Sequence, residues 1–208
     1  MSILAAVVLL AVAVPPGVSP EDARYLEAPD REPPFEMPAF EPPVFPDRDF
    51  LITAYGAVEG GTVKNTEAIA RAIAACHDAG GGRVVVPEGV WLTGPVHLKS
   101  GVNLHLADGA TLRFSDDPRD YLPPVFVRWA GFELYNYSPL IYAADCENIA
   151  ITGKGTLDGQ GRRWWPWMLR QNEVTDRIYQ QVKENVPPEE RVYGTEEWPL
   201  RPQFVVPI

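Results

Sequence analysis

Cysteine and histidine are scarce in this 208-residue sequence. Its only cysteines, Cys76 and Cys146, exclude a disulfide framework and a cysteine-rich zinc site, so we expect two buried free thiols. The three histidines, His77, His97 and His105, each stand alone in a helix or strand pattern. The sequence therefore predicts neither a catalytic histidine nor a bound metal ion.

Basic residues are also few, with 18 Lys and Arg against 28 Asp and Glu and a formal charge of −10. This balance argues against a nucleic-acid partner, which needs a basic face, and against adhesion to an anionic membrane. A polyanionic substrate would need a local basic lining. The hydrophobic fraction of 46% is ordinary for a globular chain and is enough for one domain with a core.

The N-terminus has a continuous apolar run over residues 3–14, which is too short to cross a bilayer. Its length and the Ala11-Val12-Ala13 sequence are typical of a signal peptide over residues 1–13, although no basic residue precedes Arg24. A buried apolar segment is the alternative. Ten of the 22 prolines lie between Pro15 and Pro46, which predicts an extended segment over 14–48. The folded domain is expected to span 49–208.

One amphipathic helix is expected over 66–79, because Ile69, Ala72, Ile73 and Cys76 have helical spacing. Asn65 or Thr66 can cap its first turn. Beyond it, short apolar runs recur, each closed by its own turn signal, at 84–86, 90–92, 96–98, 102–106, 110–114 and 148–159. Strands this short are better stabilised by stacking on the next coil than in a meander, which favours a β-solenoid over a sandwich or barrel. Residues 116–140 are expected to form a long loop.

Three stretches carry a family resemblance. They are FLITAYGAVEGG, then the run from NTEAIARAIAAC through GGGRVVVPEGVWLTGP to LHLADGATLRF, and finally NIAITGKGTLDGQG followed by WW. Their combination and order resemble the N-terminal part of glycoside hydrolase family 28, the polygalacturonases, in its bacterial exo-acting branch. The likeness runs from about Phe50 to the chain end and is strongest up to Gly161.

The resemblance implies an all-β fold, a right-handed parallel β-helix of the pectin-lyase type with a short N-terminal covering helix. It also implies inverting hydrolysis of α-1,4-galacturonosyl links in pectin, without a metal or cofactor. Inversion needs an acid and a base, with carboxyls about 6.5–9.5 Å apart. The family's NTD, DD, GHG and RIK motifs supply these groups, but no NTD, GHG or RIK occurs here.

Three near-matches are not carried over as catalytic. Asn65-Thr66-Glu67 begins the predicted helix, Asp116-Asp117 precedes a proline in a turn, and Arg177-Ile178-Tyr179 lies on a predicted inserted helix over 174–186. No catalytic residue is therefore assigned. Residues 202–208 resemble the entry to another coil, so we expect a β-helix that is incomplete at its C-terminus. The chain is expected to be the N-terminal part of a longer enzyme and inactive alone.

The aromatic and basic residues near the inserted segment at 162–200 are the candidates for substrate binding. Aromatic rings can stack on a sugar and guanidinium groups can pair with its carboxylate. The candidates are Arg162, Arg163, Trp164, Trp165 and Trp167, with Arg128 and Trp129 from the earlier loop. Packing of the tryptophans against the inserted helix is the competing interpretation.

The expected partner is a pectic polysaccharide or oligogalacturonide, with no nucleic acid and no membrane after signal cleavage. We expect the full-length protein to be monomeric and secreted or periplasmic. Two other functions stay open. A pectate-lyase-like eliminase would need an acidic calcium site, for which Asp116, Asp117 and Asp120 are the only local acid cluster on a loop. The second alternative function is that of a non-catalytic carbohydrate-binding β-helix module.

Overall fold

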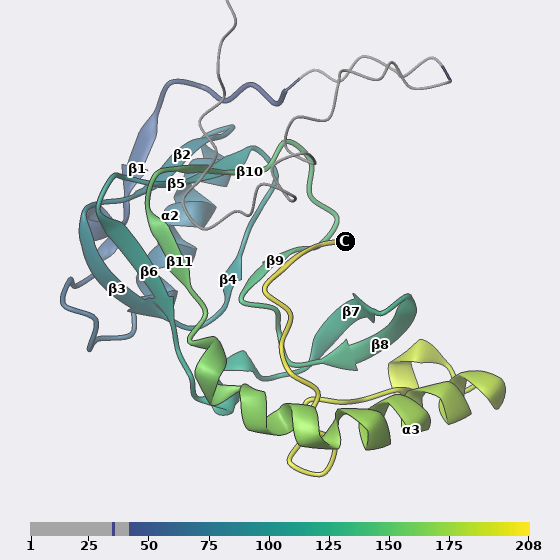
Figure 1. Ribbon diagram of the computed structural model, residues 1–208. Helices are drawn as coiled ribbons and strands as arrows, with labels where there is room; N and C mark the ends of the chain where they lie inside the picture. Colours follow the sequence, from purple (N-terminus) through teal and green to yellow (C-terminus); the bar gives the residue numbers. More distant parts are fainter. Residues whose placement is uncertain (1–34, 36–41) are drawn as a thin grey trace, which may run out of the picture. The chain divides into compact units, whose positions relative to one another are not determined.

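Short parallel strands are stacked in successive coils along the chain (Figure 1). The computed structural model describes Phe35 and residues 42–208. The predicted signal peptide at 1–13 and nearly all of the proline-rich segment lie outside these residues. Within the described residues, no helix has the length and apolar character needed to cross a membrane.

Three parallel sheets form the sides of the coils. The first contains β1 (Asp49–Leu51), β2 (Gly82–Val86), β5 (Val102–Leu106) and β10 (Ala150–Gly153), in that order. The second contains β3 (Gly89–Thr93), β6 (Ala110–Phe114) and β11 (Thr156–Asp158), and the third β4 (Val96–His97), β9 (Ile141–Ala143) and β12 (Val205–Pro207). This is the parallel β-helix that the sequence predicted.

The stacking register places like residues above one another. Val84 pairs with Leu104, and Leu104 pairs with Ile151; in the second sheet Leu112 lies between Trp91 and Leu157. Alternate side chains of β2 and β6 are buried, because successive residues of a strand point to opposite faces. Each coil therefore fills its interior with one layer of apolar side chains and buries that layer against its neighbours.

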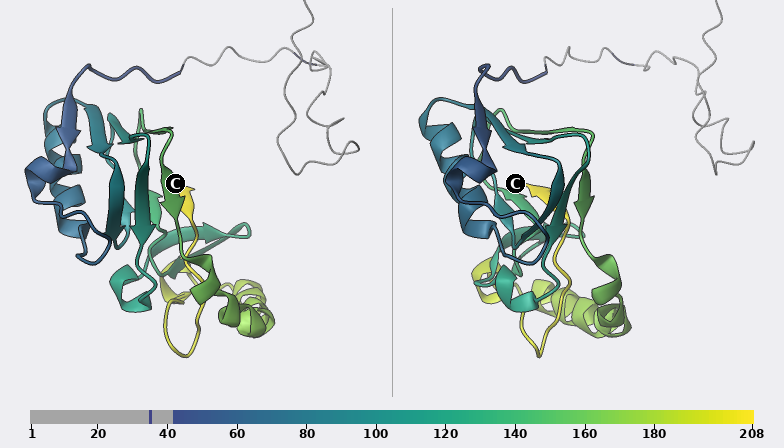
Figure 2. Two further views of the ribbon diagram at one scale, coloured as in Figure 1. Left: turned by 60° about the vertical axis from the view of Figure 1, so that its left-hand side comes forward. Right: turned by 90° about the vertical axis from the view of Figure 1, so that its left-hand side faces the viewer.

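Helix α2 (Thr66–Asp78) packs against β1, β2 and the short helix η1 (Ile52–Tyr55) at one end of this stack (Figure 2). Its buried face is the predicted one, with Ala68 added. Asn65 occupies the N-cap position as predicted, and its carbonyl accepts from the Ile69 N–H, but its side chain makes no cap hydrogen bond. The Asn65 amide instead bonds the backbone of Val58, Val63 and Leu92, and so fixes the loop before the helix.

The cysteine prediction holds fully for one residue only. Cys76 is completely buried in α2, whereas Cys146 is half-buried, and both are free thiols. Burial raises the pKa of both thiols above their ordinary value.

Two long connections, which we call the first and second excursions, leave the β-helix at the same corner, between the second and third sheets. The corresponding connection from β3 to β4 takes only residues 94–95, but that from β6 to β9 takes 115–140 and that from β11 to β12 takes 159–204. The first excursion contains η2 (Pro118–Tyr121), β7 (Val125–Trp129) and β8 (Phe132–Asn136); the second contains η3 (Gly161–Arg163), η4 (Trp165–Arg170), α3 (Gln171–Lys183) and η5 (Pro188–Glu190).

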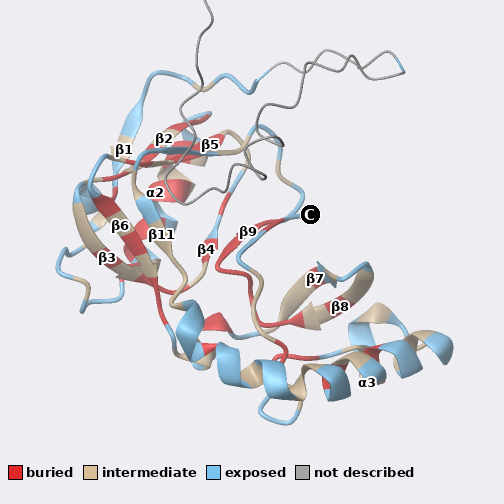
Figure 3. Ribbon diagram, viewed as in Figure 1, coloured by how far each residue is buried: buried red, intermediate tan, exposed pale blue. Residues whose placement is uncertain are grey.

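The first excursion corrects the expectation of a loop, because β7 and β8 form an antiparallel hairpin. Its two-residue turn, Ala130-Gly131, has positive φ at both positions, as a type I′ turn requires. The two excursions share a second core, in which hairpin residues Val127 and Leu134 are buried with Val174 and Ile178 of α3 (Figure 3). The hairpin and α3 are thus one packed unit beside the coils.

Candidate functional site

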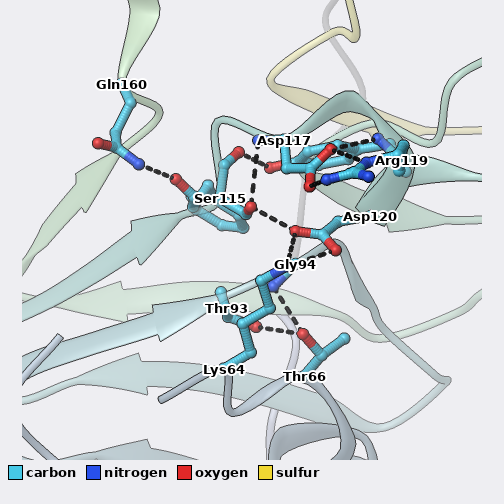
Figure 4. Close-up of polar contacts among 11 residues, drawn as sticks. Lys64, Thr66, Thr93, Gly94, Ser115, Asp117, Arg119, Asp120 and Gln160 are labelled. Atoms are coloured by element: carbon cyan, nitrogen blue, oxygen red, sulfur yellow. Dashed lines mark hydrogen bonds and ion pairs between the residues drawn. The ribbon is translucent and has the colours of Figure 1, made fainter. Parts of the chain in front are cut away.

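A polar network fixes the start of the first excursion, directly after β6 (Figure 4). The Ser115 hydroxyl donates to the Asp120 carboxylate, and the Lys64 ammonium forms an ion pair with Asp120 at 2.6 Å. The backbone N–H of Gly94 donates to Thr66 Oγ1 at 2.6 Å. The network ties the η2 turn to the loop before α2.

Asp117 lies in the same turn and is bonded to Arg119. Its carboxylate accepts hydrogen bonds from the guanidinium and backbone N–H of Arg119, with the closest side-chain contact at 2.6 Å. These bonds lower the pKa of Asp117 to about 2. Asp117 is therefore an ionised structural carboxylate, poorly suited to donating a proton in neutral solution.

A second corner, at the end of β11, sets where the second excursion begins. The Asp158 carboxylate accepts from the backbone N–H of Gln160 at 3.0 Å, which is the Asx-type bond typical of such turns. It also pairs with Arg113 at 3.2 Å. Gln160 lies in the left-handed region at φ 46°, and its side-chain amide donates to the Phe114 carbonyl at 2.6 Å. Figure 4 shows this amide reaching the strand below.

The tryptophans that follow pack in part against the coils. Trp164 is 6% exposed and makes edge-to-face contacts with Tyr121 and Trp167, at centroid distances of 5.8 and 5.1 Å. Trp167 is half-buried and also contacts Tyr137 at 5.6 Å. Trp165 differs, since it is 62% exposed. Packing thus accounts for Trp164 and much of Trp167, while Trp165 presents its ring to solvent.

A hollow of about 1190 Å³ opens between the two excursions, and we call it the basic hollow after its three arginines, Arg119, Arg163 and Arg170. Tyr137 and Trp167 also line it, together with three acidic residues, Asp116, Asp117 and Glu196. Arg119 is paired with Asp117, and Arg170 donates to Glu173 and to the carbonyls of Glu196 and Glu197. Within the described residues the Arg163 guanidinium has no such partner. Arg163 is therefore the cation of this hollow that is available to a ligand.

An aromatic hollow of about 530 Å³ lies beside the other face of the same segment. Trp129, Trp164, Trp165 and Phe204 line it, together with Gln171, Arg201, Gln203 and apolar residues. Gly161, Trp164 and Trp165 line this hollow, whereas Arg163, Pro166 and Trp167 line the basic one. The segment 161–167 thus separates two hollows of different chemistry.

The structure divides the residues predicted to bind substrate. Trp129, Trp164 and Trp165 meet in the aromatic hollow, and Arg163 and Trp167 in the basic hollow. Arg162 lies in a shallower depression with Asp116 and Asp158. Arg128 lines none of these hollows and pairs with Glu133 across the hairpin at 2.9 Å, so we withdraw it from the site.

Sequence reasoning missed Arg170, Arg201 and Gln203. Arg170 could have been found from its place after the tryptophan cluster. Arg201 and Gln203 follow the polar loop at 187–199 and carry no motif signal. They join the tryptophans only because β12 stacks on β9 and brings the end of the second excursion back to the coils.

Each of the three histidines has its own hydrogen-bond partner. His77 bonds the Ser100 carbonyl, His97 the Ser138 hydroxyl and His105 the Thr152 hydroxyl. In the part of the chain that the structure describes, no three His, Cys, Asp or Glu side chains are grouped to hold a metal ion. Arg177, from another near-match, lies over the Trp198 ring at 4.2 Å.

The architecture and the sequence together define the class: a pectin-lyase-like parallel β-helix similar to polygalacturonases. Over 79% of this chain, the fold matches the crystal structure of a hyperthermoactive exopolygalacturonase from Thermotoga maritima, with a TM-score of 0.74 and 44% sequence identity. No protein-family profile matches the sequence.

Among named proteins, the chain is 39% identical over 140 residues to the exo-poly-alpha-D-galacturonosidase of Dickeya chrysanthemi. It is 34% identical over 119 residues to a Vitis vinifera protein named "Probable polygalacturonase". These matches cover 64% and 53% of this chain. The resemblance predicted from the sequence is confirmed.

The matched region is only part of each relative. The chain spans 22% of the Dickeya protein, 24% of the Vitis protein and 39% of the Thermotoga chain.

Proposed function

We propose that these residues are part of a polygalacturonase-type glycoside hydrolase that cleaves α-1,4-galacturonosyl links in pectin with inversion. The observation that carries the proposal is the 44% identity to an exopolygalacturonase over most of the chain, on the same fold. The NTD, GHG and RIK motifs are absent from the 208 residues. The role of this chain is to supply scaffold coils and one wall of the substrate cleft.

The wall consists of the two excursions, because both leave the β-helix at one corner and enclose the basic hollow between them. In that hollow the Arg163 guanidinium, which has no ion-pair partner among the described residues, lies with the half-buried Trp167 ring in the lining. A guanidinium binds a carboxylate through two parallel hydrogen bonds, and an aromatic face packs on the apolar face of a pyranose. These are the two groups needed to recognise a uronic acid.

The location of the protein outside the cytoplasm is part of the same proposal. A pectic substrate lies outside the cell, and the apolar run at 3–14 with its Ala-x-Ala sequence is typical of a secretory signal. We propose a secreted or periplasmic monomer.

The test is to express the complete reading frame that contains these residues and to incubate the product with polygalacturonate. Release of reducing ends without ultraviolet absorbance of an unsaturated sugar supports hydrolysis. Calcium-dependent appearance of that absorbance would instead establish an eliminase. Binding without any cleavage would leave a carbohydrate-binding module.

A matched control is the 208-residue chain alone, which is expected to release no reducing ends because it lacks the catalytic motifs. Cleavage by this chain would contradict the assignment of catalysis to residues outside it.

The size of the products separates exo from endo action by the complete enzyme, since an exo-acting enzyme releases only short products from the first minutes of the reaction.

A further inference from the structure

The dipeptide Asp-Gly occurs twice in the sequence, at 108–109 and at 158–159, and the structure places the two copies in different surroundings. The first copy is the turn that joins β5 to β6, and both of its residues are exposed. The Ala110 N–H donates to the Ala107 carbonyl across this turn at 3.1 Å, and Gly109 has φ 75°. These are the features of a type II turn, which favours glycine at its third position.

The Asp108 carboxyl group and the Gly109 backbone nitrogen are both available for reaction. In the part of the chain that the structure describes, neither group has a hydrogen-bond or ion-pair partner. Glycine carries no side chain, so no Cβ hinders the approach of the Gly109 nitrogen to the neighbouring carboxyl carbon. Two reacting groups on adjacent residues also have a high effective concentration.

The second copy differs because its carboxylate is held in place. Asp158 is half-buried, accepts from the Gln160 N–H at 3.0 Å and pairs with Arg113 at 3.2 Å. The same reaction at Asp158 would first have to break both contacts. The chain therefore contains one free and one restrained copy of the same dipeptide.

We propose that Asp108 is a site of spontaneous isomerisation to isoaspartate in the folded chain. The Gly109 nitrogen attacks the Asp108 side-chain carboxyl carbon, so that a new N–C bond forms. The C–OH bond of the carboxyl group breaks, and its hydroxyl leaves with the amide proton as water. Water then opens the resulting succinimide ring. Attack at the main-chain carbonyl leaves the peptide running through the side chain, as isoaspartate, and attack at the other carbonyl restores aspartate.

Isoaspartate adds one atom to the backbone of a turn that lies between the corners of two neighbouring coils. The Gly89 N–H of the preceding coil donates to the Gly109 carbonyl at 3.3 Å, and the Lys154 N–H of the following coil donates to the Leu106 carbonyl at 3.1 Å. The flanking strands are held by their pairing, so the added atom must be accommodated within the turn. We expect loss of one or two hydrogen bonds there, and a melting temperature lowered by about 2–8 °C.

The experiment is to incubate the full chain in its folded state at neutral pH and physiological temperature for several weeks. The chain is then digested with a protease that cleaves before aspartate, and the peptides are identified by mass spectrometry. Isoaspartate resists this cleavage without a change of mass, and the succinimide is lighter by one water. Isoaspartate is expected to accumulate about tenfold faster at Asp108 than at Asp158, because Asp158 must first lose its two contacts.

Two variants serve as matched controls. Asp108→Glu keeps the charge but would have to close a larger ring, so it should form no isomer at position 108 and should keep its melting temperature during the incubation. Arg113→Gln removes the ion pair of Asp158. It should raise the rate at Asp158 about three- to tenfold and leave the rate at Asp108 unchanged.

Three results would overturn the inference. Equal rates at Asp108 and Asp158 in the folded chain would refute the role of the surroundings. Isoaspartate at Asp108 only in urea-unfolded chain would show that the turn protects this residue. If the isomer forms but the incubated chain melts with the incubated Asp108→Glu variant, the consequence for the coil is refuted. No sugar is used in these measurements, so each result leaves the proposed function unaffected.

Discussion

Replacement of Asn65 by alanine tests whether one buried amide holds the loop before α2. Asn65 is 2% exposed, and its side-chain oxygen accepts from the Val58 N–H at 2.7 Å. Its amide nitrogen lies 3.0–3.1 Å from the carbonyls of Val58, Val63 and Leu92. Two amide hydrogens cannot fully serve three carbonyls, so the side chain is equivalent to about three hydrogen bonds in total.

At about 1 kcal/mol for each bond, Asn65→Ala should lower the free energy of unfolding by about 3 kcal/mol. For a chain of this size the melting temperature should then fall by about 6–12 °C. Urea titration followed by circular dichroism measures the first quantity and a thermal scan the second. Since the bonds close a loop rather than line a hollow, binding of sugar at low temperature should be unchanged.

The matched variant is Asn65→Asp, which distinguishes the loop role from helix capping. Aspartate caps a helix as well as asparagine does, but it cannot donate to the three carbonyls and it buries a charge. We therefore expect Asn65→Asp to be at least as destabilising as Asn65→Ala. If Asn65→Asp left the free energy of unfolding unchanged, this reasoning would be refuted. The same holds if Asn65→Ala lowered the free energy of unfolding by only about 1 kcal/mol, the value typical of a lost cap.

Three further predictions concern the core, a carboxylate and the thiols. Leu112→Ala, in the middle of the second sheet, should cost about 2–5 kcal/mol in urea unfolding, whereas Leu169→Ala at a site 89% exposed should stay within about 0.5 kcal/mol. The pKa of Asp117 is depressed to about 2, so its stabilisation is complete above its ordinary pKa of 3.8 and is lost as pH falls toward 2. The melting temperatures of the unchanged chain and Asp117→Asn should therefore converge over that interval, and a constant difference would contradict the assignment. Cys76 should react with a thiol reagent only upon unfolding, while Cys146 should react in the folded chain at a rate that rises with pH.

Much of the β-helix could be predicted because each strand carries its own local pattern and turn. The runs at 102–106 and 110–114 coincide with β5 and β6, and the helix predicted at 66–79 is α2. Stacking needs no long-range signal, since each coil pairs with the next. The hairpin was missed because Ala130-Gly131 is a weak turn signal and the alternation of β7 and β8 resembles loop composition.

The candidate site was less predictable, because neighbours in the sequence face different hollows. Trp165 and Trp167 are two residues apart on the same short helix η4, yet Trp165 lines the aromatic hollow and Trp167 lines the basic hollow. Arg201 and Gln203 reach the aromatic hollow through the pairing of β12 with β9. Such placement depends on the path of the whole second excursion, which no local pattern of residues encodes.

The connections at the corner between the second and third sheets lengthen from 94–95 to 115–140 and then 159–204, while the strands they join keep their stacking. The ends of each connection are held by the sheets, so the closure entropy rises only with the logarithm of its length, by about 0.6 kcal/mol per doubling. Variation in length at this corner is therefore inexpensive to the fold, whereas the same variation inside a coil would break the register. A protein built this way can therefore vary the length of one corner segment while its coils keep their stacking.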